Sequence, residues 1–470
     1  MNIAFLHYHL KTGGVTTVLK HQTTVLRGRC DTMVLTGELP DQPFPAHTVR
    51  VPGLAYETVD PRDYNPDEVA QSICNAVHTR WPAGCDVLHV HNPTLAKNRH
   101  MLDVLKALQA RGVRLFLQCH DFAEDGRPQA CFHESYPEDC HYGVINSRDY
   151  HALTDSGLKS GGLHLLSNPV PFPATEIRSE PSRNTVLYPV RAIRRKNTGE
   201  AILLSLFFKN RETLAVTQPP NSPADFGSYR DWKEFVRTHR LNVEFEAGVN
   251  RNFPKLVSSA RYLLTTSIME GFGYCFLEAW TADKCLRGRL LPDICRDFQQ
   301  NGIGLDHLYS ALKIPLEWID VRAFFSKWNA CFKQNAAGFQ VHFSDGAIQG
   351  AFERITSDGF IDFGLLHETF QKDVIETLLT SPEKHRRFTT LNPVVEHPGS
   401  GPDCGDLIAA NKAVVQTVYT PDVYRDRLLN VYDQVIRTDV HHRIDRRRLL
   451  ACFFKPETFS LLKWCPYAAF

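Results

Sequence analysis

The stretch NIAFLHYHLKTGGVTTVLKHQTTVLRGRCDTMVLTG, residues 2–37, contains the pattern that decides the fold. A short apolar strand is broken by Gly13 and Gly14, and a helix and a second strand follow. The same order returns in a strand at 86–91, a helix at 95–112 and a strand at 113–121. Strands that alternate with helices are typical of βαβ units in a parallel sheet, so the sequence predicts an α/β fold.

A second series of the same kind begins after residues 167–184, a segment rich in Pro, Ser and Asn that is typical of a linker. Its predicted elements are strands at 185–193, 240–248 and 260–267 and helices at 197–210 and 274–282. The sequence therefore predicts two α/β domains, with a closing helix and a tail after them. The predicted bounds are 1–166, 167–420 and 421–470.

Residues 281–410 follow the strand and helix alternation poorly. We expect a mostly helical insertion in the second domain, because several of its segments have amphipathic helical patterns. Two of them are GLDHLYSALKI (304–314) and QKDVIETLLT (371–380).

The composition of the 470 residues is that of an ordinary globular protein. Lys and Arg total 53 and Asp and Glu total 52, so the net charge of +1 argues against a dedicated nucleic-acid binder. No apolar run is long enough to span a membrane, and the first residues lack the pattern of an export signal, so we expect a cytoplasmic protein. The 13 cysteines include no CxxC pair, which argues against a disulfide framework.

The tail after residue 436 combines basic residues with a group of Phe, Leu and Trp side chains at 453–464. The favoured interpretation is a segment packed on the first domain. The alternative is a helix on a membrane surface, which would give weak peripheral contact with the inner face of the membrane.

The segment TTSIMEGFGYCFLEAW, residues 265–280, places two glycines between a strand and a helix. Gly271 and Gly273 allow a tight turn, and the free N–H groups of the following helix favour an anion or hydroxyl ligand. Glu270 and Glu278 frame this corner and could contact two joined parts of one ligand. The alternative is a glycine turn with two solvated glutamates.

A second corner follows the strand that ends at Arg191. Asn197 and Glu200 have the spacing of an N-cap residue and a residue that bonds back to it, so we expect a helix to start directly after Asn197. Arg191 and Lys196 would then meet the N-terminus of this helix, a combination that suits a diphosphate. The alternative is a basic surface loop in which residues 194–195 are solvated.

Histidines recur at the ends of the predicted strands of the first domain: His7, His9, His89, His91 and His120. Pairs at i and i+2 lie on one face of a strand, so metal ligation is a further hypothesis. Zinc-competent residues with an unusual spacing also occur in one loop, at Cys131, His133, Cys140 and His141. A satisfied core histidine is the commoner outcome for each of these positions.

Taken together, these segments resemble family 4 of the retaining glycosyltransferases with the GT-B fold. The resemblance covers most of residues 1–280 and rests on KTGGVTTVL (11–19), DVLHVHNP (86–93), HDF (120–122), VRAIRRKN (190–197) and SIMEGFGYCFLEA (267–279). It is most specific in the last of these motifs, which has seven residues between its two glutamates. The sequence departs from the family at Val190, where a glycine is usual, after Glu278, and in the long insertion.

The resemblance implies two Rossmann-like domains facing across a cleft. It further implies transfer of a sugar, with retention, from a UDP-, GDP- or ADP-sugar to a hydroxyl acceptor that the sequence does not identify. No metal and no cofactor is expected, since the nucleotide sugar is a co-substrate.

The resemblance also assigns roles to individual residues. Arg191 and Lys196 would neutralise the diphosphate, and Glu278 would bond the ribose. Glu270, with the backbone of Gly271, Phe272 and Gly273, would hold sugar hydroxyls. His120 would contact the donor sugar near the reacting carbon, and Gly13 and Gly14 would lie near the diphosphate or the acceptor. The residues expected to act in catalysis are His120, Glu270, Arg191 and Lys196.

Three other functions remain open at this point. A retaining phosphorylase of the same fold would bind inorganic phosphate, but it would give Glu278 no ribose to contact. A metal-dependent hydrolase would use the histidines at the strand ends. A sugar-nucleotide sensor would bind the same ligand without turnover.

Overall fold

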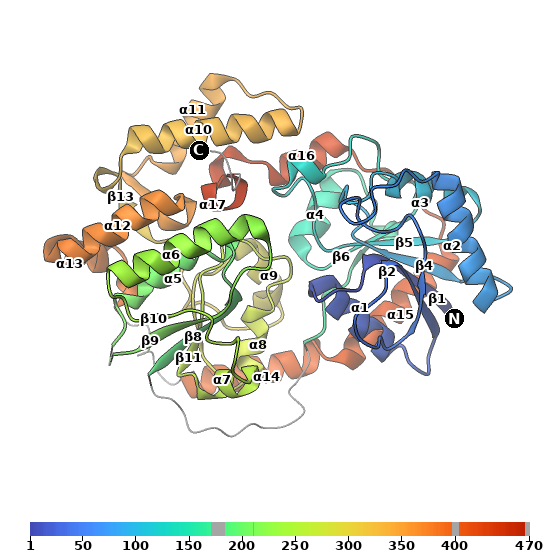
Figure 1. Cartoon of the computed structure of the whole chain (residues 1–470), viewed down its shortest axis with the longest axis horizontal. Helices are drawn as coiled ribbons and strands as arrows, with labels where there is room; N and C mark the ends of the chain where they lie inside the picture. The colour runs from blue at the N-terminus through green and yellow to red at the C-terminus, as the bar shows by residue number, and fades with distance from the viewer. Residues whose placement is uncertain (171–183, 210, 397–403, 466–470) are drawn as a thin grey trace. The chain divides into compact units, whose positions relative to one another are not determined.

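The computed structural model describes residues 1–170, 184–209, 211–396 and 404–465. They form two compact units, each described by itself (Figure 1). The N-terminal unit consists of Met1–Pro171 and Thr417–Phe454, and the C-terminal unit consists of Phe172–Gln416 and Lys455–Phe470. Most of the expected linker at 167–184 lies outside the described residues.

The N-terminal unit contains a seven-stranded parallel sheet with the strand order β3-β2-β1-β4-β5-β6-β7. Its strands are β1 (Asn2–His9), β2 (Asp31–Glu38), β3 (His47–Arg50), β4 (Val87–His91), β5 (Leu115–Cys119), β6 (His141–Val144) and β7 (Leu163–Leu165). Its helices are α1 (Gly14–Val25), α2 (Pro66–Arg80), α3 (Met101–Ala110), α4 (Ser147–Asp155), α15 (Pro421–Arg437) and α16 (Arg446–Phe453).

Helices cover both faces of this sheet because its strands are apolar on both sides. Alternate side chains point to opposite faces, so Ile3 and Phe5 of β1 belong to one core cluster and Ala4 and Leu6 belong to the other. The first cluster is closed by α1 and α15, and the second by α2, α3, α4 and α16. Figure 1 shows α15, in red, among the blue elements of the N-terminal unit, so the predicted closing helix is present.

The C-terminal unit contains a five-stranded parallel sheet with the strand order β10-β9-β8-β11-β12. Its strands are β8 (Thr185–Arg191), β9 (Thr213–Gln218), β10 (Val243–Glu244), β11 (Tyr262–Thr265) and β12 (Leu286–Gly288). The helices associated with these strands are α5 (Thr198–Ser205), α6 (Phe226–Thr238), α7 (Phe253–Ser259), α8 (Cys275–Thr281) and α9 (Pro292–Gln300). Both sheets share one order of their first five strands. The first strand of each sheet has the second and third strands of its unit on one side and the later strands on the other.

The insertion of the C-terminal unit is mostly helical, as the sequence predicts. It contains α10 (Val321–Gly338), α11 (Asp345–Ile355), α12 (Glu368–Thr380), α13 (Pro382–Leu391), α14 (Cys404–Val418) and an antiparallel pair, β13 (Lys313–Pro315) with β14 (Phe360–Asp362). Its predicted start at residue 281 is wrong, because β12 at 286–288 still pairs with β11 in the main sheet. The helix predicted at 304–314 is also wrong, since most of that segment is irregular and its end forms part of β13.

Other element bounds differ from the sequence prediction. The helix expected from residue 95 begins only at Met101, because residues 92–100 form a loop at the end of β4. The strand expected at 240–248 is reduced to Val243–Glu244. The strand β9 and the helix α6 were not predicted.

The tail is divided between the two units. Helix α16 packs against α4 of the N-terminal unit, whereas α17 (Leu461–Trp464) packs against α10 of the C-terminal unit. The apolar side chains at 453–464 are buried at Phe453, Phe454, Phe459, Leu461, Leu462 and Trp464. The membrane-surface interpretation is therefore wrong for these side chains. Within the described ranges, no helix is both long and apolar enough to cross a membrane.

Candidate functional site

The strand order of each sheet reverses direction at one point, between β1 and β4 in the N-terminal unit and between β8 and β11 in the C-terminal unit. Ligands of open α/β sheets bind beyond the carboxyl ends of the strands at such a switch point. The predicted site residues follow these strands or, for His120, the neighbouring strand β5. Lys196 follows β8 and Glu270 follows β11, while Gly13 and His120 follow β1 and β5.

The turn between β8 and α5 is held against the end of β11. The hydroxyl of Tyr188 donates to the carbonyl oxygen of Lys196, and the hydroxyl of Thr266 lies 3.1 Å from the same oxygen and 3.0 Å from that of Asn197. Asn197 has a left-handed backbone with φ of 52°. These bonds fix the backbone position from which the side chain of Lys196 extends.

Lys196 and Glu270 form an ion pair across the switch point of the C-terminal unit. Their side chains are only 15% and 13% exposed, so the pair is well shielded from bulk water. Burial alone would raise the pKa of Glu270, but the positive charges of Lys196 and Arg195 outweigh this effect and the pKa lies below its usual value. Glu270 is therefore an ionised carboxylate that orients a lysine ammonium at neutral pH.

The other predicted site residues of this unit are close to Lys196 or Glu270 in the sequence. Arg191 ends β8 and is exposed, and Glu278 is an exposed residue of α8, which starts directly after Tyr274 as expected. Gly273 has φ of +86°, and a Cβ there would lie 3.0 Å from side-chain atoms of Ile294, so a glycine is required. Phe272 is buried, with its ring centroid 5.6 Å from that of Phe298.

The expected capping pair has a different role. Asn197 makes no side-chain bond to the backbone of α5, and its amide donates instead to the carboxylate of Glu200 at 2.7 Å. Glu200 is fully buried and bonds Arg289 at 2.6 Å, and Arg289 in turn bonds Asp362 at 2.8 Å. This buried charge network, Glu200–Arg289–Asp362, joins the start of α5 to the ends of β12 and β14.

Sequence reasoning missed Arg289 and placed Arg194 wrongly. Arg194 is buried, not solvated, and donates to the carbonyl oxygens of Cys465 at 2.7 Å and Leu461 at 3.1 Å. These bonds hold the last described helix, α17, beside the turn that carries Lys196. A run of three basic residues in the sequence gave no indication that one of them was internal.

The N-terminal unit places a cluster of histidines at its switch point. His91 Nδ1 and His120 Nε2 lie 2.8 Å apart, and the amide of His120 donates to the side chain of Asn92 at 2.7 Å. His89 lies 2.9 Å from both the hydroxyl of Tyr432 and the amide oxygen of Gln118. His120, a predicted site residue, is thus fixed in a network of neutral hydrogen-bonding groups.

Burial keeps these imidazoles uncharged. It lowers the pKa of His7 to about 3, of His89 to about 3 and of His120 to about 4. Across the described chain, His7 Nδ1, His9 Nδ1 and His91 Nε2 are buried nitrogens without a hydrogen-bond partner. A hydroxyl group that entered this cluster would satisfy them.

Gly13 and Gly14 lie where α1 begins, in an exposed position after β1. The backbone of Gly13 is extended, and a Cβ on Gly14 would meet no atom within 4 Å. The free protein therefore places no steric demand on these two glycines.

The residues considered for zinc have other partners. Cys131 accepts a bond from Arg446 at 3.1 Å, and His141 Nδ1 lies 2.9 Å from His164 Nε2. Within the described ranges, no three His, Cys, Asp or Glu side chains are grouped as metal ligands would be. All the cysteines are free thiols in the structure.

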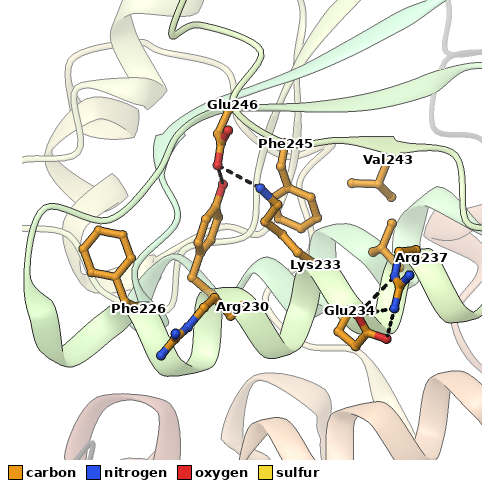
Figure 2. A pocket seen from close by; sticks show the side chains of 10 residues that line it. Phe226, Arg230, Lys233, Glu234, Arg237, Val243, Phe245 and Glu246 are labelled. Atoms are coloured by element: carbon orange, nitrogen blue, oxygen red, sulfur yellow. Dashed lines mark hydrogen bonds and ion pairs between the residues drawn. The ribbon is translucent and has the colours of Figure 1, made fainter.

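A surface hollow of about 730 Å³ lies elsewhere on the C-terminal unit, between α6 and β10. Figure 2 shows Lys233 beside Glu246 and Arg237 beside Glu234, with Arg230 outside these pairs. Lys233 and the hydroxyl of Tyr229 both bond Glu246 at 2.9 Å, and Arg237 pairs with Glu234 at 2.6 Å.

Comparison with known proteins agrees with this architecture. No family model matches the chain. Two solved structures superpose on most of it: a glycosyltransferase from Rickettsia africae (TM-score 0.53, 8% identity, 93% of this chain and 99% of that one) and Anabaena HepE in complex with UDP-glucose (TM-score 0.50, 13% identity, 92% and 98%). The fold is GT-B. Its two Rossmann-like units confirm the predicted fold class.

The sequence also resembles one curated protein, the mannosylglucosyl-3-phosphoglycerate synthase of Petrotoga mobilis, with 26% identity over 344 residues. The match covers 63% of this chain and 66% of the synthase, which is slightly less than two thirds of the relative's length. This similarity marks the two chains as homologues.

Proposed function

We propose that this protein is a retaining glycosyltransferase that moves a sugar from a nucleoside-diphosphate sugar to a hydroxyl acceptor, without a metal ion. The observation that carries the proposal is Lys196, which is fixed at the switch point between β8 and β11 and oriented by the ionised Glu270. The resemblance to the Petrotoga synthase supports glycosyl transfer, and the GT-B neighbour in complex with UDP-glucose supports the same donor class.

The proposed chemistry needs charge stabilisation at the leaving group. The bond between the anomeric carbon and the phosphate oxygen breaks, the acceptor oxygen bonds that carbon on the same face, and the acceptor proton passes to the leaving phosphate. Lys196 and Arg191 would stabilise the charge that develops on the diphosphate, because preorganised cations need no rearrangement during the reaction. Glu278 would accept bonds from the ribose hydroxyls, and Glu270 would hold sugar hydroxyls.

In the N-terminal unit, His120 and its neighbours would contact neutral groups. Uncharged imidazoles are suited to sugar hydroxyls, since each ring offers a donor and an acceptor. Gly13 and Gly14 would allow the donor or acceptor to approach the backbone at the start of α1. We find no observation that favours the phosphorylase or the hydrolase: Glu278 would have no ribose to bind in the first, and the second lacks a ligand group among the described residues.

The test is a calorimetric titration of the full chain with UDP, GDP, ADP and their common sugars, with and without a chelator. We expect one nucleotide class to bind, to be unaffected by the chelator, and to bind much more weakly to Lys196→Ala. Lys255→Ala is the matched control, because Lys255 is an exposed lysine of the same unit. Binding of inorganic phosphate alone, with no nucleotide bound, would contradict the proposal and favour a phosphorylase.

A further inference from the structure

The loop that follows β4 carries a lysine in an unusual setting. Lys97 is half-buried, and in the described part of the chain no carboxylate lies within ion-pair distance of its ammonium group. Burial lowers the pKa of Lys97, and the nearby positive charge of Arg127 lowers it further. A half-buried cation beside another cation is destabilised unless an anion joins them.

The backbone around Lys97 and Arg127 is fixed by contacts between the loops after β4 and β5. The amide of Ala96 donates to the carbonyl oxygen of Ala130 at 2.8 Å, and Leu95 packs with Ala123 and Ala130 in a small apolar cluster. The carbonyl oxygen of Lys97 accepts a bond from the backbone amide of Glu57 at 3.0 Å. These contacts hold the backbone of Lys97 beside the loop that carries Arg127.

The charges around this pair do not balance. Arg127 contacts Asp121 at 3.3 Å, and Lys11 pairs with Glu38 at 2.6 Å. Burial raises the pKa of Tyr56, and the charges of Arg127, Asp121 and Glu38 also act on it. Each of these two carboxylates therefore has its own cation, and among the described residues no carboxylate pairs with Lys97.

The pair also lies at the edge of the sheet where buried histidine nitrogens lack partners. Lys97 follows β4 and Arg127 follows β5, and these are the strands that end in His91 and precede His120. The ring of His9, whose Nδ1 has no hydrogen-bond partner in the described chain, lies edge-on to Tyr56 with a centroid distance of 5.0 Å. One ligand could thus present an anion to the cations and a hydroxyl to the imidazoles.

We infer that Lys97 and Arg127 bind an anionic group, a phosphate monoester or a carboxylate, on the acceptor. This inference rests on the proposed function and names the class of its second substrate, an anionic compound that also carries the hydroxyl to be glycosylated. Arg127 would contact two oxygens of the anion through its planar guanidinium, and Lys97 would supply a point charge. Asp121 would position Arg127.

The experiment measures anion binding directly, without turnover. The full chain is titrated by calorimetry with 3-phosphoglycerate, glycerol 3-phosphate, glycerate, inorganic phosphate and glycerol. We expect at least one organic anion to bind and glycerol not to bind. Glycerol 3-phosphate and glycerate separate a phosphate site from a carboxylate site, and tighter binding of inorganic phosphate than of any organic anion would overturn the assignment to an acceptor.

The variants are Lys97→Gln and Arg127→Gln, with Lys159→Gln as the control, because Lys159 is an exposed lysine of the same unit. We expect at least a tenfold loss of anion affinity in each of the first two and no change in the control. Lys97→Gln should fold normally, since it removes an uncompensated charge, and its thermal midpoint checks this. Equal anion binding by Lys97→Gln and the wild type would overturn the inference, as would a wild type that binds none of the anions.

Donor binding is measured separately on the same variants. If Lys97→Gln loses the anion but keeps the nucleotide, both proposals stand. If the anion binds through Lys97 and no nucleotide binds the wild type, the transferase proposal fails and the anion site remains.

Discussion

The two units share the order of their first five strands but fill their switch points with different kinds of polar group. The N-terminal unit buries imidazoles that are uncharged, such as His89 and His120. The C-terminal unit buries full charges, in the pair Lys196–Glu270 and in the network Glu200–Arg289–Asp362. The difference teaches that one strand order can carry either buried neutral hydrogen-bonding groups or buried full charges at its switch point.

The largest expected effect comes from breaking the charge network of the C-terminal unit. Arg289→Met leaves the carboxylates of Glu200 and Asp362 without their cation, and breaking a buried ion pair in this way costs ~3–5 kcal/mol of unfolding free energy. Urea unfolding measures it. The control is Arg237→Met, which removes an exposed ion pair with Glu234 and should have little effect. Equal stability of the two variants would show that the network does not stabilise this unit.

The next effect concerns the charge at the switch point itself. Lys196→Ala should lower the turnover of the donor by roughly a hundredfold or more, as loss of one preorganised charge-stabilising group does. The rate is compared with that of Lys255→Ala, which should equal the wild type. A near-normal rate in Lys196→Ala would remove this lysine from the reaction and weaken the contrast between the units.

The neutral imidazoles of the N-terminal unit make its stability depend on pH. Burial lowers the pKa of His89 to about 3, so between about pH 6.5 and pH 3 the unfolded chain binds a proton there that the folded chain does not. The unfolded state is therefore favoured as the pH falls through this window, by about 1.4 kcal/mol per pH unit for one histidine.

The variant His89→Gln should remove that contribution and flatten the pH dependence of unfolding, measured by hydrogen exchange in the N-terminal unit at several pH values. The control is His151→Gln, because His151 is an exposed histidine of α4. An unchanged slope in His89→Gln would mean that His89 is charged in the folded protein.

The smallest effect is expected at Glu278. Loss of its hydrogen bonds to a ribose in Glu278→Ala should weaken nucleotide affinity roughly tenfold, the range for bonds to a charged group, and leave the fold intact. The control is Glu383→Ala, an exposed glutamate on α13. Calorimetry with the bound nucleotide decides it, and unchanged affinity would contradict the ribose contact.

Much of the fold was predictable because local patterns determine it. The strand, glycine turn and helix of residues 2–25 appear as expected, and so does the turn that ends at Gly273. The strand β9 gives no sequence signal because its four central residues, 214–217, are all buried, so the strand shows no alternation of apolar and polar positions. The irregular segment at 304–314 was not predictable, because its apolar residues have the same spacing as those of an amphipathic helix.

The candidate site was predictable only in part. The residues that follow strands, such as Lys196 and Glu270, carry a sequence signal because carboxyl ends of parallel strands meet at one edge. Arg289 and Asp362 carry no such signal, since Arg289 meets Glu200 across 89 positions and Asp362 meets Arg289 across 73, and no spacing rule links them. Glu200 was instead read as a capping residue. The cation pair of Lys97 and Arg127 likewise becomes visible only when the two loops are folded together.

The central claim, that the donor diphosphate binds at the corner of Lys196 and Glu270, is tested most directly by hydrogen exchange of the full chain with and without the nucleotide that binds it. The account predicts protection of the backbone at 191–198 and 270–278. Protection confined to residues 226–246, which line the hollow of Figure 2, would contradict it.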